Sequence, residues 1–484
     1  MILIWYSCRV LLYICWYRCF FIIGELLLPA PFKIFGVRKT SKSQAKRFSK
    51  LLIALGPSYI KLGQLLSLQS MIIGDIFANE LAKLQDTTNN CKFSKIDSIL
   101  KKELGEDYAQ LFIEIDKNPI ASASIAQIHY AVLKNNHEKV AIKVIKPYVK
   151  KLIHNELKFI KACIYFIDNF TRSGKRIQFK NFYSVLEEHL NSELNLRLEA
   201  SAMNQMRDHI KDIPNVVIPT VFLEHSRQTV LIMEWIEGAK INDTDFIKQH
   251  NLNPKKIAYS LCNVFFYQVL DKGFFHADLH PGNVLINTRG EVVLLDFGIM
   301  CYLSSKSQSI LILLSKAFIK RDYNAFARIH FLAGWVNDDY NSMQFSIHIR
   351  SIIDDFSYNY SLADALSRLI GITSAFNMRS QSSVLLLQKN LLLLQRILSC
   401  LVEDTNIWLF SKGIIMRRVG QKPSSVHIAN LYQEQVKHNM KNLNDKLNLA
   451  LDRFTAPQKK ITWHFIVIMM LFISIIFFVL YFRF

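Results

Sequence analysis

The sequence predicts an α+β fold of two lobes, extended by helices near the N-terminus and by a transmembrane helix near the C-terminus. Three observations support this prediction. Residues 111–237 contain short apolar runs typical of strands, such as Val140–Val144, whereas residues 250–435 are mainly helix-prone. Residues 461–482 carry no formally charged side chain unless His464 is protonated. A helix of that length spans about 33 Å, which is enough to cross one bilayer.

The expected elements follow one another along the chain. The strand-rich lobe is interrupted by a long helical insertion at 150–210, and Val230–Trp235 predicts a strand that leads into a hinge at Glu237-Gly238. The leucine-rich stretch Leu385–Leu401 is too continuously apolar for a coiled coil and is expected in the core of the second lobe. The predicted boundaries are 1–50 for an apolar and then basic segment, 51–110 for a helical extension, 111–237 and 238–435 for the two lobes, 436–460 for a polar linker and 461–482 for the span.

One acidic constellation indicates the chemistry. Asp278 is followed five residues later by Asn283, and eighteen residues later by Asp296, the first residue of Asp-Phe-Gly. This is the arrangement of a kinase catalytic loop, in which one carboxylate orients the acceptor hydroxyl while an amide and a second carboxylate hold magnesium. An acidic surface turn is the alternative, but the added Asp-Phe-Gly at this spacing argues against it.

A second constellation is expected upstream. Lys143 is the single charge in the apolar strand Val140–Val144, and in kinases such a lysine contacts the nucleotide phosphates and pairs with a helix glutamate. Glu199 is the expected partner. It lies in a helical segment that also contains Glu193, which occupies a different face of that helix. Glu156 is closer to Lys143 in sequence and is the competing candidate.

The glycine-rich loop of kinases is absent. Where it is expected, before Lys143, the chain reads Pro119-Ile-Ala-Ser-Ala-Ser-Ile-Ala-Gln-Ile-His129. Alanine and serine are small enough to let backbone amides approach phosphates, but they lack the freedom of glycine at positive φ. We therefore expect a stiffer loop with a different grip on nucleotide.

These motifs together resemble the UbiB family of atypical kinase-like proteins, which is linked to ubiquinone biosynthesis. The resemblance rests on the Ala/Ser loop, Val-Ala-Ile-Lys143, His-Ala-Asp278-x-His-Pro-Gly-Asn283 and Asp296-Phe-Gly. Upstream, Lys61-Leu-Gly-Gln64 resembles the Lys-x-Gly-Gln signature of the family, and Glu80–Asp86 resembles the segment that follows it. The motifs extend over roughly residues 1–300.

The resemblance implies a role for each matching residue, with ATP and Mg²⁺ as the cofactors. Asp278 takes the position of the catalytic base, and Asn283 and Asp296 take the magnesium positions. Lys143 and Glu199 form the phosphate-binding pair, while Lys61, Gln64 and Glu193 belong to elements that fold over the pocket. The nucleotide loop comprises Ile120, Ala121, Ser122, Ala123, Ser124, Ile125, Ala126, Gln127 and Ile128. The chain departs from the family pattern at Asn195, where an Asp is expected, and at Gln69, where an Arg is expected.

Composition favours a membrane-associated protein. Hydrophobic residues make up 51% of the 484, and the formal net charge is +20. Residues 1–24 are apolar but contain Arg9 and Arg18, so a helix lying on the membrane is favoured over a span. A basic cluster follows, which suits an anionic lipid surface, and no nucleic-acid recognition motif accompanies it. Its members are Arg38, Lys39, Lys42, Lys46, Arg47 and Lys50.

Localisation follows from the charges and the cysteines. Lys459 and Lys460 precede the expected span and Arg483 follows it, which favours a catalytic domain on the cytoplasmic side. A bacterial inner membrane is expected because the chain starts with the apolar segment typical of the family, without an appended Ser/Arg-rich transit peptide. The mitochondrial inner membrane is the alternative. The eight cysteines include no C-x-x-C pair and are expected to be reduced thiols.

Residues 299–330 contain no Ala-Pro-Glu and no long activation segment, which argues against ordinary protein substrates. The sequence therefore predicts a membrane-associated atypical kinase or ATPase that supports ubiquinone biosynthesis and acts on or gates lipid-like small molecules. Ubiquinone precursors and biosynthetic enzymes are the expected partners, and the oligomeric state stays open. Two alternatives remain: a non-catalytic, nucleotide-gated scaffold for biosynthetic enzymes, and a small-molecule phosphotransferase.

Overall fold

The computed structural model describes eight main stretches of the chain, together with Tyr13, Phe376 and Thr405. These stretches are residues 42–67, 73–81, 83–84, 90–170, 179–336, 340–356, 382–403 and 407–420. The chain divides into two compact units, Met1–Ile428 and Ala429–Phe484, and every described residue belongs to the first. The predicted N-terminal membrane segment, the polar linker and the predicted span at 461–482 lie outside the described residues. Within the described part, no helix is long and apolar enough to cross a membrane.

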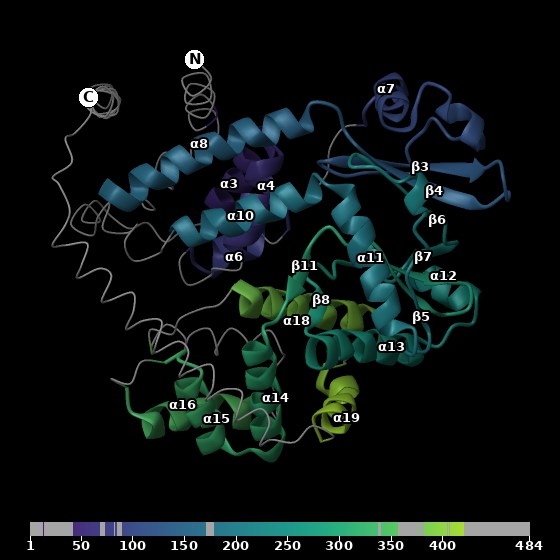
Figure 1. The fold of residues 1–484 in the computed structure, drawn as a ribbon. Helices are drawn as coiled ribbons and strands as arrows, with labels where there is room; N and C mark the ends of the chain where they lie inside the picture. The colour runs from purple at the N-terminus through teal and green to yellow at the C-terminus, as the bar shows by residue number, and fades with distance from the viewer. Residues whose placement is uncertain are drawn as a thin grey trace. The chain divides into compact units, whose positions relative to one another are not determined.

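A group of helices precedes and follows the first strands, and we call it the N-terminal helical group. Helix α3 buries Phe48, Leu51 and Leu55 while its lysines remain exposed. Gly56, with φ of +126°, ends this helix and lets α4 begin at Pro57 in a new direction. The group comprises α3 (Lys42–Leu55), α4 (Pro57–Ser67), α6 (Asp75–Leu81), α8 (Val149–Phe170) and α10 (Phe179–Glu193), with α4 contacting the other four (Figure 1).

The first lobe is built on a five-stranded antiparallel sheet. Its order is β1-β3-β4-β6, with β2 paired to β3. The strands are β1 (Phe112–Ile115), β2 (Ala121–Ser122), β3 (Ala126–Leu133), β4 (Lys139–Ile145) and β6 (Val230–Glu234). The single turn η2 (Tyr108–Leu111) follows helix α7 (Phe93–Leu104), and η3 (Leu223–His225) precedes β6.

Alternation along β4 determines which side chains face the site. Val140, Ile142 and Val144 pack with α7 in a small apolar core, whereas Ala141 and Ile145 belong to the main core on the other face. Because side chains of a strand alternate between faces, Lys143 lies on the side of Ala141 and Ile145.

Helix α11 (Leu196–Ile210) packs against β6. The sequence places Glu193 and Glu199 in one continuous helical segment, and this prediction is wrong. The helix breaks at Leu194-Asn195, where the Asn195 side chain accepts a hydrogen bond from the backbone N–H of Arg197 and caps α11. Asparagine is a favoured N-cap because its side-chain oxygen satisfies an amide that has no helical partner. The two glutamates therefore belong to different helices.

The second lobe contains a four-stranded sheet of order β5-β10-β9-β7 and the two-stranded pair β8–β11. Their bounds are β5 (Val216–Val217), β7 (Gly238–Lys240), β8 (Phe274–His276), β9 (Val284–Asn287), β10 (Val292–Leu294) and β11 (Met300–Tyr302). Helices supply the rest of this lobe. They are α12 (Thr244–Gln249), α13 (Pro254–Tyr267), the π-helical turn η4 (Gln268–Lys272), η5 (Pro281–Asn283), α14 (Ser305–Lys320), α15 (Tyr323–Leu332), α16 (Ser342–Phe356), α18 (Ser382–Leu401) and α19 (Ile407–Gly420).

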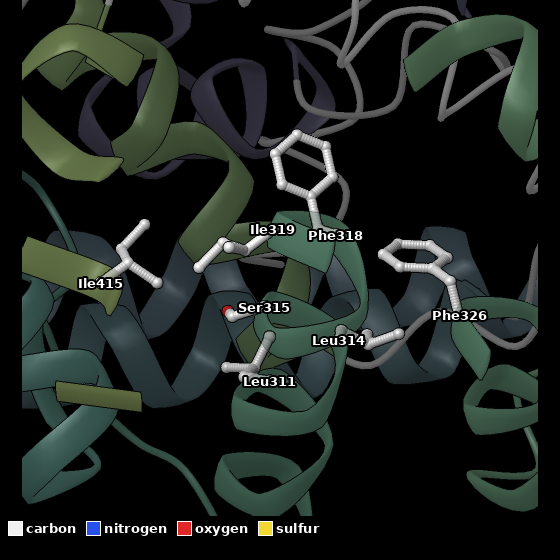
Figure 2. A pocket seen from close by; sticks show the side chains of 7 residues that line it. All are labelled: Leu311, Leu314, Ser315, Phe318, Ile319, Phe326 and Ile415. Atoms are coloured by element: carbon white, nitrogen blue, oxygen red, sulfur yellow. The ribbon is translucent and has the colours of Figure 1, made fainter. Parts of the chain in front are cut away.

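The second lobe also contains an apolar pocket of about 170 Å³ (Figure 2). Its walls come from α14, α15 and α19, and none of the predicted site residues lines it. The lining residues are Leu311, Leu314, Ser315, Phe318, Ile319, Phe326 and Ile415.

Candidate active site

Strand β4 and helix α11 bring two of the predicted site residues together. Lys143 Nζ lies 2.7 Å from Glu199 Oε1 and 3.0 Å from Oε2, so the sequence-based choice of Glu199 as partner is confirmed. The same ammonium lies 3.1 Å from Asp296 Oδ1. Burial alone would lower the pKa of Lys143, but Asp296 and Glu199 outweigh it and raise the pKa above its ordinary value. Lys143 is therefore a permanent cation.

The competing candidate, Glu156, has a different role. It is fully buried on α8, and its Oε2 accepts a hydrogen bond of 3.2 Å from the backbone N–H of Ser58 in the first turn of α4. A carboxylate at a helix N-terminus is stabilised by the helix dipole. Glu156 thus holds α4, the helix that carries Lys61.

His276 organises the loop that contains Asp278. Its Nδ1 accepts from the backbone N–H of Asp278, and its Nε2 therefore donates to the carbonyl of Leu295, immediately before Asp296. The Asn283 amide donates to the backbone carbonyl of Asp278 at 3.1 Å. One buried imidazole thus fixes both acidic segments, and burial lowers its pKa so that it stays neutral.

The Asp-Phe-Gly turn places a carboxylate where a ligand can reach it. Asp296 has φ of +55°, a left-handed conformation that Asp tolerates better than most residues, and nearly half of its side chain is exposed. Phe297 is buried and packs edge-on against His276. The Ser192 hydroxyl at the end of α10 donates to the Gly298 carbonyl at 3.1 Å, which joins α10 to this turn.

Lys61 and Glu193 meet beside this turn. Lys61 Nζ lies 2.8 Å from Glu193 Oε1 and joins α4 to the end of α10. A Cβ added at Gly298 would lie 3.2 Å from Asp296 Oδ1 and 3.6 Å from Glu193 Cγ, so the two acidic side chains flank the same glycine. Gln64, one turn after Lys61, donates from Nε2 to the Leu84 carbonyl and ties α4 to the segment after α6.

The Ala/Ser loop is a tight hairpin between β2 and β3. Ala121 pairs with Ile128, Ser122 pairs with Gln127, and the Ala123 N–H donates to the Ala126 carbonyl. Lys146 at the end of β4 anchors the turn by donating from Nζ to the Ala123 carbonyl at 2.7 Å. The described residues of this hairpin all have negative φ, so glycine is not needed to form it.

Sequence reasoning missed three polar residues that contact or approach Asp278. Lys389 Nζ lies 2.7 Å from Asp278 Oδ1, and Asn390 accepts from the Leu279 N–H. His189 on α10 lies in the electrostatic field of Lys389, Lys61 and Asp278. Burial is the largest cause that lowers its pKa, the two lysines lower it further, and the resulting pKa is about 4. The available signal was a Lys-Asn pair inside the leucine-rich stretch 385–401, but nothing in the sequence linked it to position 278.

The electrostatics of Asp278 reflect these neighbours. Burial would raise its pKa, but Lys389 and Lys61 outweigh burial and hold the pKa well below its usual range. Asp278 is therefore ionised at neutral pH, which is the state that can accept a proton.

The residues present fit a magnesium nucleotide. Among the described residues, no group of three or more His, Cys, Asp or Glu side chains is arranged to hold a metal ion by itself. Magnesium is commonly held by one or two carboxylates together with substrate phosphates, and Asp296 with Asn283 offers that kind of donor set. In the hairpin, the hydroxyls of Ser122 and Ser124 are buried without a hydrogen-bond partner among the described residues. Such groups gain most from a ligand that accepts from them.

A strand lysine paired with a helix glutamate, an Asp-x4-Asn loop and an Asp-Phe-Gly turn define the class of protein-kinase-like folds. The model of the ABC1 atypical kinase-like domain matches residues 83–330. A protein of Marinobacter nauticus named "Probable protein kinase UbiB" is 31% identical over 414 residues, covering 82% of this chain and 76% of that protein. The chain belongs to the UbiB family of ABC1 atypical kinase-like proteins.

A solved structure shows the same fold. The Rv3197–erythromycin complex from Mycobacterium tuberculosis has a TM-score of 0.52 and 21% sequence identity, and the match covers 75% of this chain and 94% of that one. At this identity the likeness concerns the fold alone.

Proposed function

We propose that this protein is an atypical kinase or ATPase that binds ATP with Mg²⁺, transfers the terminal phosphoryl group to a lipid-like small molecule or to water, and supports ubiquinone biosynthesis at a membrane. One observation carries the proposal. The five residues that phosphoryl transfer needs come from four separate segments of the chain, and they converge as two clusters, Lys143–Glu199–Asp296 and Asp278–Asn283.

Each residue has a role in this proposal. Lys143, held by Glu199, binds the nucleotide phosphates, and the Ala/Ser hairpin covers them with backbone amides. Asp296 and Asn283 hold the magnesium ion, whose contribution is to neutralise charge that develops on the phosphates. Asp278 orients the acceptor hydroxyl and accepts its proton.

The region after the Asp-Phe-Gly turn supports a small substrate. Strand β11 begins at Met300 and pairs with β8, and α14 begins at Ser305 with Ser304 as its cap. This leaves no long segment on which a peptide could dock. In addition, Lys61 and Glu193 join two helices of the N-terminal helical group beside the same turn. Lipid-like acceptors are therefore favoured over proteins.

Membrane association is part of the proposal and is supported by α3. Lys42, Lys46 and Lys50 are spaced by one helical turn and are exposed, as is Arg47. Basic residues near an anionic leaflet contribute about 1 kcal/mol each. The opposite face of α3 is buried against α4 and α6, so the charged face is available to a surface of anionic lipid.

Replacing the proposed base tests the activity. Asp278→Asn should lower ATP turnover by about 10³-fold, because the amide cannot accept a proton, while Mg–ATP binding persists. Turnover should be measured on the purified full-length protein with neutral and with anionic vesicles, and anionic vesicles should stimulate it. Asp208→Asn, the same change at an exposed position on α11, is the matched control.

Complementation of a ubiquinone-deficient strain adds the cellular readout. Asp278→Asn should fail to restore quinone synthesis, whereas Asp208→Asn should restore it. Full rescue by Asp278→Asn would contradict a role for turnover and favour the nucleotide-gated scaffold. Turnover that ignores lipid would contradict the membrane part of the proposal.

A further inference from the structure

Helix α18 places a lysine side chain against the proposed catalytic base. Lys389 Nζ lies 2.7 Å from Asp278 Oδ1, across 111 residues of sequence. Both side chains are mostly covered, with 23% of Lys389 and 27% of Asp278 exposed. This partial exposure leaves the pair within reach of a ligand that enters the site, while most of the lysine stem is held by its surroundings.

The neighbouring residue fixes this geometry. Asn390 is fully buried, its Oδ1 accepts from the Leu279 N–H at 2.8 Å, and its Nδ2 donates to the Leu386 carbonyl within α18. The helix also contacts α13 and β11. A buried amide bonded on both sides has a single favourable orientation. Asn390 therefore positions α18 so that Lys389 meets Asp278.

The other two lysines near the acidic residues are held elsewhere. Lys143 pairs with Glu199 and Asp296, and Lys61 pairs with Glu193. Lys389 contacts Asp278 directly, and Asp278 is the residue that the acceptor must approach. A cation at this point lies on the acceptor side of the reaction, where negative charge builds up on the transferring phosphoryl oxygens.

We propose that Lys389 is a catalytic residue whose ammonium group binds the transferring phosphoryl group. This inference rests on the proposed function. In the structure the ammonium is neutralised by Asp278, and in the reaction it turns to the phosphoryl oxygens and frees the carboxylate. The pairing with Asp278 keeps the ammonium in place between turnovers.

The oxygen of the acceptor hydroxyl or of water forms a bond to the γ-phosphorus, and the bond from that phosphorus to the β–γ bridging oxygen breaks. ADP leaves with the electron pair of that bond, and Asp278 takes the acceptor proton. Lys389 keeps its own proton throughout and contributes charge only.

Three variants of the full-length protein test the role. Lys389→Met should lower ATP turnover by about 10²–10³-fold, the range found when one preorganised donor of this kind is lost. Lys389→Arg keeps the charge and should recover at least about tenfold of that loss. Lys412→Met changes an exposed lysine of α19 and should leave turnover unchanged.

Two further readouts separate a chemical role from a structural one. Affinity for Mg–ADP should change by less than about threefold in Lys389→Met, because the lysine acts on the transferring group. Affinity for Mg–ADP with aluminium fluoride, an analogue of that group, should fall by at least about tenfold.

The outcomes distinguish this inference from the proposed function. If the wild-type protein turns over ATP and Lys389→Met is equally or more active, the proposed role of Lys389 is wrong, but the proposed function stands. Wild-type protein that binds nucleotide without turning it over would overturn the proposed function and this role together. If Lys389→Met fails to fold, Lys389→Gln replaces it, and the same comparison with Lys389→Arg decides.

Discussion

Two lysine–carboxylate pairs flank the candidate active site, and they have similar distances and similar burial of the lysine. Lys143 lies 2.7 Å from Glu199 and Lys61 lies 2.8 Å from Glu193, and 11% of each lysine side chain is exposed. The elements that carry them differ. Lys143 is placed by the register of a five-stranded sheet and by α11 packed against it, whereas Lys61 is placed by the packing of α4 onto other helices. Similar contacts are thus produced by a sheet on one side and by helix packing on the other.

This difference implies unequal consequences when the pairs are broken. Glu199 is 3% exposed, while Glu193 is 13% exposed at the end of a helix. A carboxylate left unpaired in the interior retains its full desolvation cost, but one near solvent can be hydrated. We therefore expect the Lys143 side to be integral to the fold and the Lys61 side to be separable from it.

The largest expected effect compares the two lysines directly. Lys143→Met should lower the free energy of unfolding by about 3–5 kcal/mol, because it leaves Glu199 buried and unpaired. Lys61→Met should cost roughly 1–2 kcal/mol, since Glu193 can reach solvent. Denaturant unfolding of the full-length protein measures both. Lys139→Met, on the same strand as Lys143 but exposed, is the control, and its midpoint should stay unchanged. Equal losses of unfolding free energy for Lys143→Met and Lys61→Met would contradict the expected difference between the two pairs.

An intermediate effect should appear at acid pH on the helical side. His189 faces Lys61, Lys389 and Asp278, and its pKa in the folded protein is about 4 against an ordinary value of 6.5. The unfolded chain therefore binds the proton first, so this contribution is fully present above pH 6.5 and is lost as the pH falls toward 4. At about 1.4 kcal/mol per unit of pKa, the loss is roughly 3 kcal/mol.

The matched variants are His189→Gln and His348→Gln. The first should flatten the dependence of unfolding free energy on pH between 4 and 6.5, and the second, at an exposed position, should leave it unaltered. If the pH dependence of the unfolding free energy is unchanged in His189→Gln, protonation of other groups causes the loss of stability at acid pH.

The smallest effect concerns the packing that places Lys61. A Cβ added at Gly63 would lie 2.5 Å from Leu84 Cδ1 and 2.6 Å from Leu52 Cδ1. Gly63→Ala should therefore destabilise by about 1–3 kcal/mol through overpacking. Gly413→Ala in α19, where a Cβ meets nothing within 4 Å, should be neutral or stabilising because alanine favours helix. The contrast would fail if both glycines gave the same shift of the unfolding midpoint.

Local patterns account for what the sequence predicted well. The apolar run around Lys143, the Asp-x4-Asn loop and the Asp-Phe-Gly turn are each short, and their chemistry depends on spacing within a few residues. The pairing of Lys143 with Glu199 was predicted from the kinase pattern, in which the strand lysine pairs with a glutamate of a helix. The predicted roles of these residues in ATP and magnesium binding stay predictions.

Long-range contacts account for what it missed. Asn195 interrupts a helical pattern that is otherwise continuous, and only the local geometry shows that its side chain caps the next helix. Lys389 and Asn390 lie in a stretch whose leucines indicate core, and their contact with Asp278 and Leu279 depends on how α18 packs across the lobe. Periodicity reports which face of a helix is buried, but it does not report which loop that face meets.

The separation of 111 residues between Asp278 and Lys389 also has a consequence for biosynthesis. At roughly 5–20 residues per second, Lys389 is synthesised about 6–20 s after Asp278. During that interval a nascent chain holds the Asp-x4-Asn loop and the Asp-Phe-Gly turn but lacks both the lysine and the asparagine that seats it. Under the proposed roles of Asp278 and Lys389, a partly made chain is therefore an incomplete catalyst, and the order of the sequence itself would limit ATP hydrolysis by ribosome-bound or prematurely ended products.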